Sequence, residues 1–344
     1  MQKKLYGILV YIISCLMCLM SAWSTGSLIF NVSVAGDSVS SENSSVTEST
    51  EYEPEKEIPD ENTTASSAEE IGSSSMPTNT AASALGRISE QVTAYTSGQS
   101  SGGVHIRDLT GTDIDISKIL KKTPSVKLKN TSAPQVLVLH THATESFMTA
   151  EKEYYTEADA TRSTDDRKNM VAIGKTFCET LEKAGIGTVQ ITTHFDNPAY
   201  TGSYTRAKTE IEKYLKKYPT IKVVVDIHRD SITNGTTKTK PTVTIDGKKA
   251  AQVMLVMGSG TGKVKNHPKW EENLALAARY QQTMAKNYPK FARCMMVSSK
   301  LYNQNLTTGS MLIEIGTEAN TFSEANYSAS LAATSLAQTL KNLG

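Results

Sequence analysis

Two histidines and a glutamate lie within six residues of one another in the segment His140-Thr141-His142-Ala143-Thr144-Glu145. The apolar run Val136 to Leu139 comes directly before it, so the pattern predicts a buried strand that leads into a loop. Imidazole nitrogens and carboxylate oxygens are common protein ligands of catalytic zinc, which takes about three of them and keeps one position open. This loop is therefore a candidate metal site.

Two further apolar runs carry groups of the same chemistry. Ile221 to Ile227 leads to His228, and Met311 to Ile315 contains Glu314 and is followed by Glu318. In a largely parallel sheet, ligands bind beyond the carboxyl ends of the strands. We therefore expect the groups from all three runs to meet in one cleft.

The spacing suggests a role for each member of this set. His142, Glu145 and His228 supply the three ligands that a catalytic zinc needs, since His142 and Glu145 are three residues apart and His228 arrives from a neighbouring strand. Glu314 is the candidate for moving the proton during hydrolysis, with Glu318 as the alternative. His and carboxylate ligands also suit manganese or iron.

Other side chains near these strand ends are expected to support the site. Asp226 and Asp230 flank His228, and carboxylates beside a ligating histidine commonly orient its ring. His140 is either an alternative ligand or a partner of one, and Arg229 either contacts a substrate carboxylate or stays solvated. The remaining histidines lie in polar, loop-like stretches and are expected at the surface: His105, His194 and His267.

Short apolar runs alternate with amphipathic segments from about residue 130 onward, which predicts an α/β fold with a mainly parallel twisted sheet and helices on both faces. Predicted helices are Asp165–Ala184, Thr205–Lys217, Trp270–Tyr288 and Phe322–Leu343. Predicted strands, besides the three apolar runs above, are Thr188–Thr193, Thr242–Ile245, Ala251–Met257 and Cys294–Val297. The Asp246-Gly247 pair predicts a hairpin that joins Thr242–Ile245 to Ala251–Met257 at a sheet edge.

Residues 1–26 have the pattern of a membrane anchor. Lys3 and Lys4 precede an uncharged stretch from Leu5 to Trp23, which as a helix would cover roughly 28 Å, close to the bilayer core of about 30 Å. Positive charge before the span predicts a cytoplasmic N-terminus and an exported remainder. A cleaved signal peptide is the alternative, but its apolar core is usually shorter and ends in a small-residue site that is poorly matched here.

Composition separates an acidic tether from a basic domain. Residues 27–100 are expected to form a disordered tether rich in Ser, Thr and Glu, and residues 36–90 hold 12 acidic against two basic side chains. From residue 91 onward there are 32 Lys and Arg against 23 Asp and Glu, and residues 101–344 are expected to form one catalytic domain. A basic exported surface suits an anionic polymer such as cell wall, although nucleic acid and lipid headgroups attract it equally.

Three motifs in this order resemble the stage II sporulation protein P family. They are His-Thr-His-Ala-Thr-Glu-Ser at 140–146, Asp-Ile-His-Arg-Asp at 226–230 and Ile-Glu-Ile-Gly-Thr-Glu-Ala-Asn-Thr at 313–321. The resemblance covers about residues 105–344 and extends to the overall plan of anchor, tether and catalytic domain.

The resemblance implies a zinc-dependent N-acetylmuramoyl-L-alanine amidase with a wall-amidase-like fold, a peptidoglycan hydrolase for cell wall degradation that also cleaves peptide cross-links. It implies action in engulfment during endospore formation, on the outer side of the forespore septum or engulfing membrane. The implied partners are peptidoglycan, the membrane and stage II sporulation proteins D and M, and not nucleic acid.

One motif departs from the pattern of the wider amidase group. There the first zinc histidine commonly lies in a Gly-His-Gly-Gly turn, and the glutamate ligand comes well downstream. Here Thr141-His142-Ala143-Thr144 takes that place, which leaves Glu151, Glu153 and Glu157 as alternatives to Glu145. Two other functions also remain open at this stage, a wall-binding scaffold at the forespore membrane and a zinc endopeptidase that does not cleave the amide.

Overall fold

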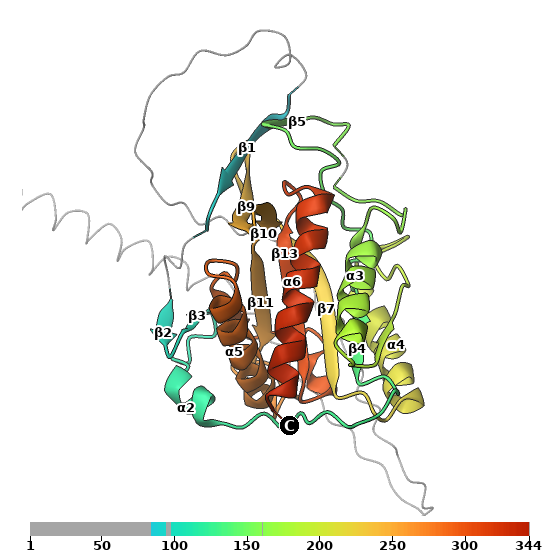
Figure 1. The fold of residues 1–344 in the computed structure, drawn as a ribbon, viewed down its shortest axis with the longest axis vertical. Helices are drawn as coiled ribbons and strands as arrows, with labels where there is room; N and C mark the ends of the chain where they lie inside the picture. Colours follow the sequence, from blue (N-terminus) through green and yellow to red (C-terminus); the bar gives the residue numbers. More distant parts are fainter. Residues whose placement is uncertain (1–83, 94–97, 160, 344) are drawn as a thin grey trace, which may run out of the picture. The chain divides into compact units, whose positions relative to one another are not determined.

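A central eight-stranded sheet organises the chain in the computed structural model, which describes residues 84–93, 98–159 and 161–343. The strands lie in the order β2, β3, β12, β11, β13, β7, β4, β6 (Figure 1). Their bounds are Gln99–Ser101 for β2, Val104–Asp108 for β3, Met295–Ser298 for β12, Val253–Gly258 for β11, Ser310–Thr317 for β13, Val223–Asp230 for β7, Val136–Leu139 for β4 and Thr188–Gln190 for β6.

Most neighbours in this sheet run parallel. Only β2 with β3 and β11 with β13 pair antiparallel, whereas the other neighbouring pairs are parallel. The parallel trio of β13, β7 and β4 brings three strand ends to one edge. The expected fold class, a mainly parallel α/β sheet, is confirmed.

Helices cover both faces of the sheet, as expected. Alternate residues of β4 show this, because Val136 and Val138 join one apolar cluster while Leu137 and Leu139 join another. The first cluster includes α3 (Met170–Lys183), α5 (Trp270–Asn287) and α6 (Phe322–Lys341), and the second includes α4 (Ser203–Lys217). A short helix, α2 (Ile116–Lys121), packs on α5, and a 3-10 turn, η2 (Gln304–Leu306), precedes β13.

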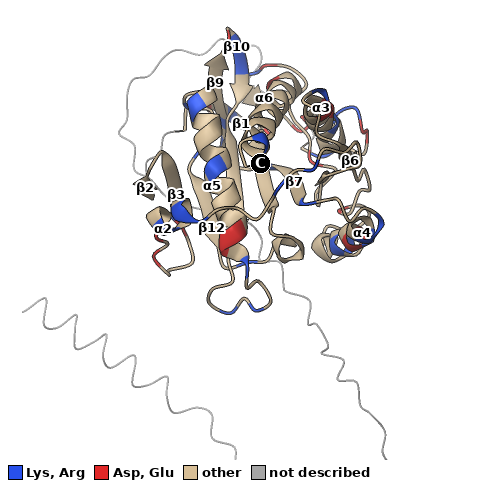
Figure 2. Cartoon of the chain, turned by 60° about the horizontal axis from the view of Figure 1, so that its bottom comes forward, with Lys and Arg blue, Asp and Glu red and all other residues tan. Residues whose placement is uncertain are grey.

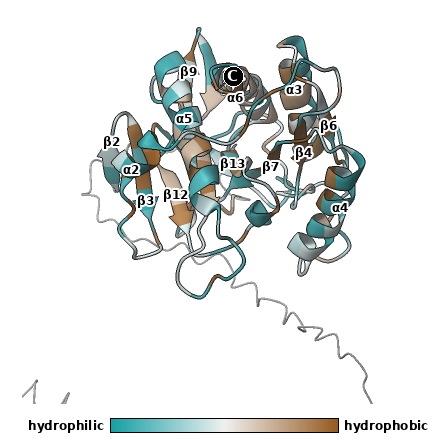
Figure 3. Ribbon diagram, turned by 90° about the horizontal axis from the view of Figure 1, so that it is seen from below, coloured by the Kyte–Doolittle hydropathy of each residue, from teal (hydrophilic) through white to brown (hydrophobic). Residues whose placement is uncertain are grey.

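The pattern of hydropathy explains why these strands lie at the centre. Apolar residues dominate β4, β7 and β12 (Figure 3), while charged residues gather on helix surfaces such as those of α4 and α5 (Figure 2). Strands buried on both faces read as nearly continuous apolar runs rather than alternating ones. A polar residue inside such a strand therefore needs a partner or a function.

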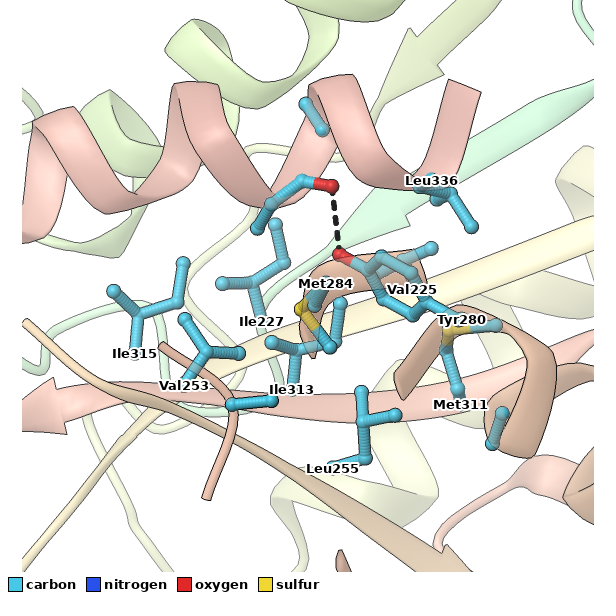
Figure 4. Close-up of a cluster of buried hydrophobic side chains, with 14 of the residues drawn as sticks. Val225, Ile227, Val253, Leu255, Tyr280, Met284, Met311, Ile313, Ile315 and Leu336 are labelled. Carbon is cyan, nitrogen blue, oxygen red and sulfur yellow. Dashed lines mark hydrogen bonds between the residues drawn. The ribbon is translucent and has the colours of Figure 1, made fainter. Parts of the chain in front are cut away.

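Tyr280 of α5 packs in the centre of the larger cluster. Its ring is fully buried beside Ile313 and Met311 of β13, and its hydroxyl donates to the carbonyl oxygen of Ala332 in α6 at 2.8 Å (Figure 4). This one polar group is thus satisfied within an otherwise apolar layer. The packing holds α5 and α6 against the strand that carries Glu314.

A second sheet of five strands corrects the predicted hairpin. Its order is β10 (Lys248–Ala251), β9 (Thr237–Ile245), β1 (Gly86–Gln91) and β5 (Tyr154–Tyr155), with β8 (Thr233–Asn234) beside β9. Asp246 and Gly247 do form a turn with positive φ, and it lies at the edge strand. The turn joins β9 to β10, however, and Val253–Gly258 is a separate strand of the central sheet.

Strand β1 lies within the range expected to be a tether. It runs parallel to β9 from Arg87 to Gln91 and antiparallel to β5 at Gly86 and Arg87. The expected tether end at residue 100 is therefore wrong, because folded structure begins near residue 85. The expected anchor and most of the tether lie outside the described residues, and in the described part no helix is long and apolar enough to cross a membrane.

Candidate metal and acid–base site

The loop after β4 is held by backbone pairing on two sides. Ser146 donates its N–H to the carbonyl of Thr161 at 3.0 Å, and Ser163 donates to Thr144. Beyond these bonds, Met148 exchanges backbone hydrogen bonds with Asn320 and Phe322 at the start of α6. The loop that carries His142 and Glu145 is thus fixed against two distant segments.

The structure brings three of the sequence-predicted groups together at the ends of β4 and β7. The rings of His142 and His228 lie edge to face with centroids 5.1 Å apart. Nδ1 of His228 lies 3.7 Å from Oε2 of Glu145, and all three side chains are buried. Ligand atoms on one zinc ion are about 3.4 Å apart when each bond is about 2.1 Å and the geometry is tetrahedral. The separation of this nitrogen and oxygen is thus close to that of two ligands on one ion.

The two imidazoles differ in their electrostatic surroundings. Burial, together with the neighbouring His228, lowers the pKa of His142 to about 2. Burial also disfavours the charged form of His228, but Asp226, Glu145 and Glu314 outweigh it and raise the pKa of His228 to about 10. His142 is therefore neutral at pH 7, the form that ligates metal, and His228 lies among carboxylates that favour any positive charge.

Asp226 lies beside His228 on the same strand. Its Oδ1 is 2.9 Å from Nε2 of His228, and it also accepts hydrogen bonds from the backbone and the hydroxyl of Thr141. Burial favours its neutral form, yet the charge of His228 and the bonds from Thr141 lower the pKa of Asp226 overall. Asp226 therefore stays ionised and links β7 to the loop after β4.

Glu314 is paired directly with His228 in the register of β13 and β7. It is flanked by fully buried Ile313 and Ile315, and burial raises the pKa of its carboxyl well above its usual range, with Asp230 and Glu145 adding to the effect. A carboxyl group whose pKa is raised in this way can hold and release a proton near neutral pH.

Glu318 and Arg229 have structural partners. Glu318 accepts from Ser231 at 3.1 Å and pairs with Lys238 and Arg229. Arg229 donates to the carbonyl oxygens of Ser146, at 2.9 Å, and Thr161 and is only 8% exposed. Arg229 is thus buried rather than solvated, and its guanidinium holds the site loop from inside, while its contact with a substrate carboxylate stays a prediction.

His140 and Asp230 also have partners of their own. Nδ1 of His140 donates to the carbonyl oxygen of Ile227 at 2.9 Å, and its Nε2 accepts from Gln190 at 3.0 Å. Asp230 pairs with Arg293 at 2.7 Å rather than with His228. With both ring nitrogens engaged, His140 supports the strand ends, whereas His142 faces His228.

The three alternative carboxylates downstream of Glu145 lie on the surface. Glu151, Glu153 and Glu157 are exposed, and Glu151 pairs with Lys240 and Lys249. Glu145 is instead buried, and its Oε2 accepts from the backbone N–H of Arg229 at 3.2 Å. Of these four carboxylates, Glu145 is the one beside the histidines.

Several residues at the site were not identified from the sequence. Tyr200 stacks on His142 with centroids 4.3 Å apart, and Tyr204 lies edge-on to His142 at 5.8 Å. Arg162 approaches Glu145 to within 3.8 Å and pairs with buried Asp196. These residues come from polar loops or from the first turn of α4, where no apolar periodicity or short motif marks them.

Unpartnered atoms show how far the site fits a metal. Within the described chain, Nδ1 of His142 and Oε2 of Glu314 are buried here without a hydrogen-bond partner, whereas Nε2 of His228 has Asp226 at 2.9 Å. Buried polar groups without partners are rare and commonly mark the place of an ion or a water molecule, or a catalytic role. Across residues 84–93, 98–159 and 161–343, no three His, Cys, Asp or Glu side chains form a ready metal-binding group. The side chains of His142, Glu145 and His228 therefore fit zinc in type and proximity, although they do not yet form a complete three-ligand group.

The fold and site define an α/β protein with imidazole and carboxylate groups gathered at the carboxyl ends of parallel strands. A family model described as Stage II sporulation protein P (SpoIIP) matches residues 25–337. The chain therefore belongs to the stage II sporulation protein P family.

Individual known proteins are similar to this chain to different degrees. Stage II sporulation protein P of Bacillus subtilis (strain 168) is 31% identical over 209 residues, which cover 58% of this chain and 49% of that protein. The match thus spans about half the length of this relative. Among solved structures, N-acetylmuramoyl-L-alanine amidase AmiC2 of Nostoc punctiforme covers 62% of this chain and 98% of its own, at 12% identity and a TM-score of 0.36. An N-acetylmuramoyl-L-alanine amidase from Clostridium difficile 630 covers 62% and 97%, at 18% identity and a TM-score of 0.37.

Proposed function

We propose that this chain is a zinc-dependent peptidoglycan hydrolase that cleaves the amide between N-acetylmuramic acid and L-alanine. The observation that carries the proposal is the convergence of His142, Glu145, His228 and Glu314, with unpartnered buried atoms on His142 and Glu314. Membership of the stage II sporulation protein P family supports a role in spore formation.

His142, Glu145 and His228 would hold the zinc. When bound, zinc supplies Lewis acidity, which activates water near neutral pH and polarises an amide carbonyl. Asp226 orients His228, and the backbone of Arg229 orients Glu145. The chain's own contribution is therefore to fix the donors and to keep His142 neutral.

Glu314 is the group that moves the proton. It is half-buried with its Oε2 out of contact with solvent, and desolvation and neighbouring carboxylates raise the pKa of its carboxyl. Such a group can take a proton from the attacking water and deliver it to the leaving alanine nitrogen. Glu318 is the weaker candidate because its oxygens are engaged by Ser231, Lys238 and Arg229.

We place this reaction outside the cytoplasmic membrane during engulfment. The proposal takes residues 1–26 as a single-pass anchor, on the strength of the uncharged stretch after Lys3 and Lys4. Stage II sporulation proteins D and M are the proposed partners, by resemblance to the family.

Product analysis tests the reaction. Purified protein incubated with cell wall should release new L-alanine amino groups and denuded glycan, and a zinc chelator should abolish the release. New termini confined to the peptide cross-bridges would show an endopeptidase instead. Release of no chelator-sensitive product would favour a wall-binding scaffold and contradict the proposal.

Metal analysis tests the ligands separately. His142→Ala and His228→Ala should each lose bound zinc together with activity, because each removes one of about three ligands. His194→Ala is the matched control, since this histidine pairs with Asp166 instead. Zinc content unchanged in both ligand variants would rule out the assignment.

A further inference from the structure

Arg162 places a partly exposed cation at the edge of the site. Its Nη1 lies 2.7 Å from Oδ2 of Asp196 and donates to the hydroxyl of Thr144 at 3.2 Å, while Nη2 lies 3.8 Å from Glu145. The side chain of Asp196 is fully buried, whereas that of Arg162 is 41% exposed. The buried carboxylate thus fixes one side of the guanidinium and leaves the group accessible to solvent.

Tyr200 connects this cation to the proposed metal ligand. Its ring stacks on His142 at an interplanar angle of 14°, and Cζ of Arg162 lies 4.9 Å from the ring centroid. Tyr200 is a large side chain with 44% exposure. Arg162 and Tyr200, called here the Arg162–Tyr200 rim, therefore form a continuous accessible surface that begins at His142.

We propose that the Arg162–Tyr200 rim is a subsite that binds a carboxylate of the substrate peptide, one residue beyond the amide that is cut. This inference rests on the proposed function. In wall peptides, L-alanine is followed by D-glutamate linked through its side-chain carboxyl, so the α-carboxylate is free unless it is amidated. The Arg162–Tyr200 rim would make the enzyme prefer peptides whose D-glutamate has a free α-carboxylate (the acid form) over peptides in which this carboxylate is amidated.

The chemistry and the reach both suit this role. Guanidinium groups match carboxylates with two parallel hydrogen bonds, and the exposed part of the Tyr200 ring offers an apolar contact for the peptide. Two extended residues span about 7 Å, and the guanidinium of Arg162 lies within 3.8 Å of Glu145. A carboxylate next to the leaving alanine can therefore reach Arg162 while the amide lies at the histidines.

Arg229 cannot serve as this subsite although it lies beside Glu145. Its guanidinium donates to Ser146 and Thr161, and only 8% of the residue is exposed. Of the two arginines that contact Glu145, Arg162 is therefore the one that a substrate can reach.

Peptide binding to the metal-free full-length chain tests the subsite without relying on activity. Calorimetry would measure a peptide containing L-alanine and γ-linked D-glutamate against the same peptide with its α-carboxylate amidated. The unchanged chain should bind the acid form about tenfold more tightly, as expected for a hydrogen bond to a charged group. Arg162→Gln should bring this ratio to about one, and Arg162→Lys should give an intermediate ratio because lysine lacks the planar fork.

The ratio within one preparation does not depend on the fraction of folded protein, so partial unfolding of a variant cannot imitate the result. Arg87→Gln is the matched control, since Arg87 also lies over a tyrosine ring, that of Tyr154. Arg87→Gln should keep the ratio of the unchanged chain.

Three outcomes would overturn the subsite: no binding of either peptide, equal binding of both, or a preference that survives in Arg162→Gln. The proposed function has its own result, which is cleavage of muramyl peptides by the zinc-loaded chain. Cleavage without a preference for the acid form of the peptide would contradict the subsite alone. A preference for the acid form without any cleavage would contradict the proposed hydrolase function instead.

Discussion

Glu314 shows how a single residue can mark a site. A carboxylate between two buried isoleucines is costly unless it is paired, protonated or functional. The structure gives it His228 as its neighbour across the strand pair, no hydrogen-bond partner within the described chain for Oε2, and a raised pKa. These properties suit a group that exchanges protons better than one that only stabilises the fold.

Glu314→Gln should reduce wall hydrolysis by about 10²–10⁴-fold, the usual contribution of a general acid–base group. Zinc content should stay unchanged, because Glu314 is not among the proposed ligands. Glu318→Gln is the control and should keep most activity while lowering the melting temperature, since it breaks pairs with Arg229 and Lys238. If the Glu314→Gln variant stays active, another group must move the proton during hydrolysis.

The residues identified from the sequence share one signal. His142, Glu145, His228 and Glu314 each lie in or next to an apolar run, so the runs predicted both the strands and their polar members. Arg162 and Tyr200 lie in loops whose course depends on backbone pairing with Thr144 and Ser146 and on buried Asp196. Such long-range contacts leave no local pattern, and these residues could not be predicted.

At the scale of elements, a buried lysine joins β9 to the start of α6. Lys240 is 2% exposed, and its Nζ lies 2.8 Å from Glu324. Glu324 also accepts from the backbone of Thr321, which caps the helix in return. This ion pair therefore couples the second sheet to the helix that follows Glu318.

Lys240→Ala should lower the free energy of unfolding by about 3–5 kcal/mol, because it leaves the buried charge of Glu324 without its partner. Lys249→Ala is the matched control, since Lys249 shares the partners Glu90 and Glu151 but is 42% exposed. Lys249→Ala should lower the free energy of unfolding by less than about 1 kcal/mol. Urea unfolding would measure both, and equal costs would show that burial of the pair does not matter.

The segment before α5 contains a histidine whose position was predicted incorrectly. His267 was expected at the surface, yet it is 2% exposed, and burial lowers the pKa of its ring to about 4. Polar neighbours in sequence suggested a solvated loop, but the carbonyl of His267 packs against Gly260, where a Cβ would lie only 2.4 Å from it. Close backbone packing of this kind is not visible in composition.

His267 should make stability depend on pH. The unfolded ring takes up a proton as pH falls below about 6.5, whereas the folded ring resists until about pH 4, so its contribution is present above pH 6.5 and is lost on acidification. Between pH 7 and pH 4.5, the free energy of unfolding of His267→Asn should therefore fall by about 2 kcal/mol less than that of the unchanged chain. Urea titrations at the two pH values would measure the difference. Equal decreases in the free energy of unfolding of the variant and of the unchanged chain would contradict the prediction.

At the scale of the whole molecule, the fold class followed from the alternation of apolar and amphipathic segments, while the second sheet did not. Strands β1, β5 and β8 are short and contain no buried residue, so their sequences carry no strand period. Strands β1 and β8 pair with β9, a long partner of nine residues, and β5 pairs with β1 in turn. Pairing that depends on a distant strand sets the domain boundary, and composition alone placed that boundary too late.

Two truncations test where the folded domain begins. A chain that starts at Ala84 keeps the pairing of β1 with β9 and β5 and the contacts of Glu90 with Lys240 and Lys249. Its melting temperature should equal that of the full chain. A chain that starts at Ala94 loses all of these contacts and should melt at least about 5 °C lower, since each 1 kcal/mol shifts the melting temperature of a domain this size by about 2–4 °C. Equal melting of the two truncations would mean that β1 adds nothing to the folded domain, and the tether would then extend beyond it as composition suggested.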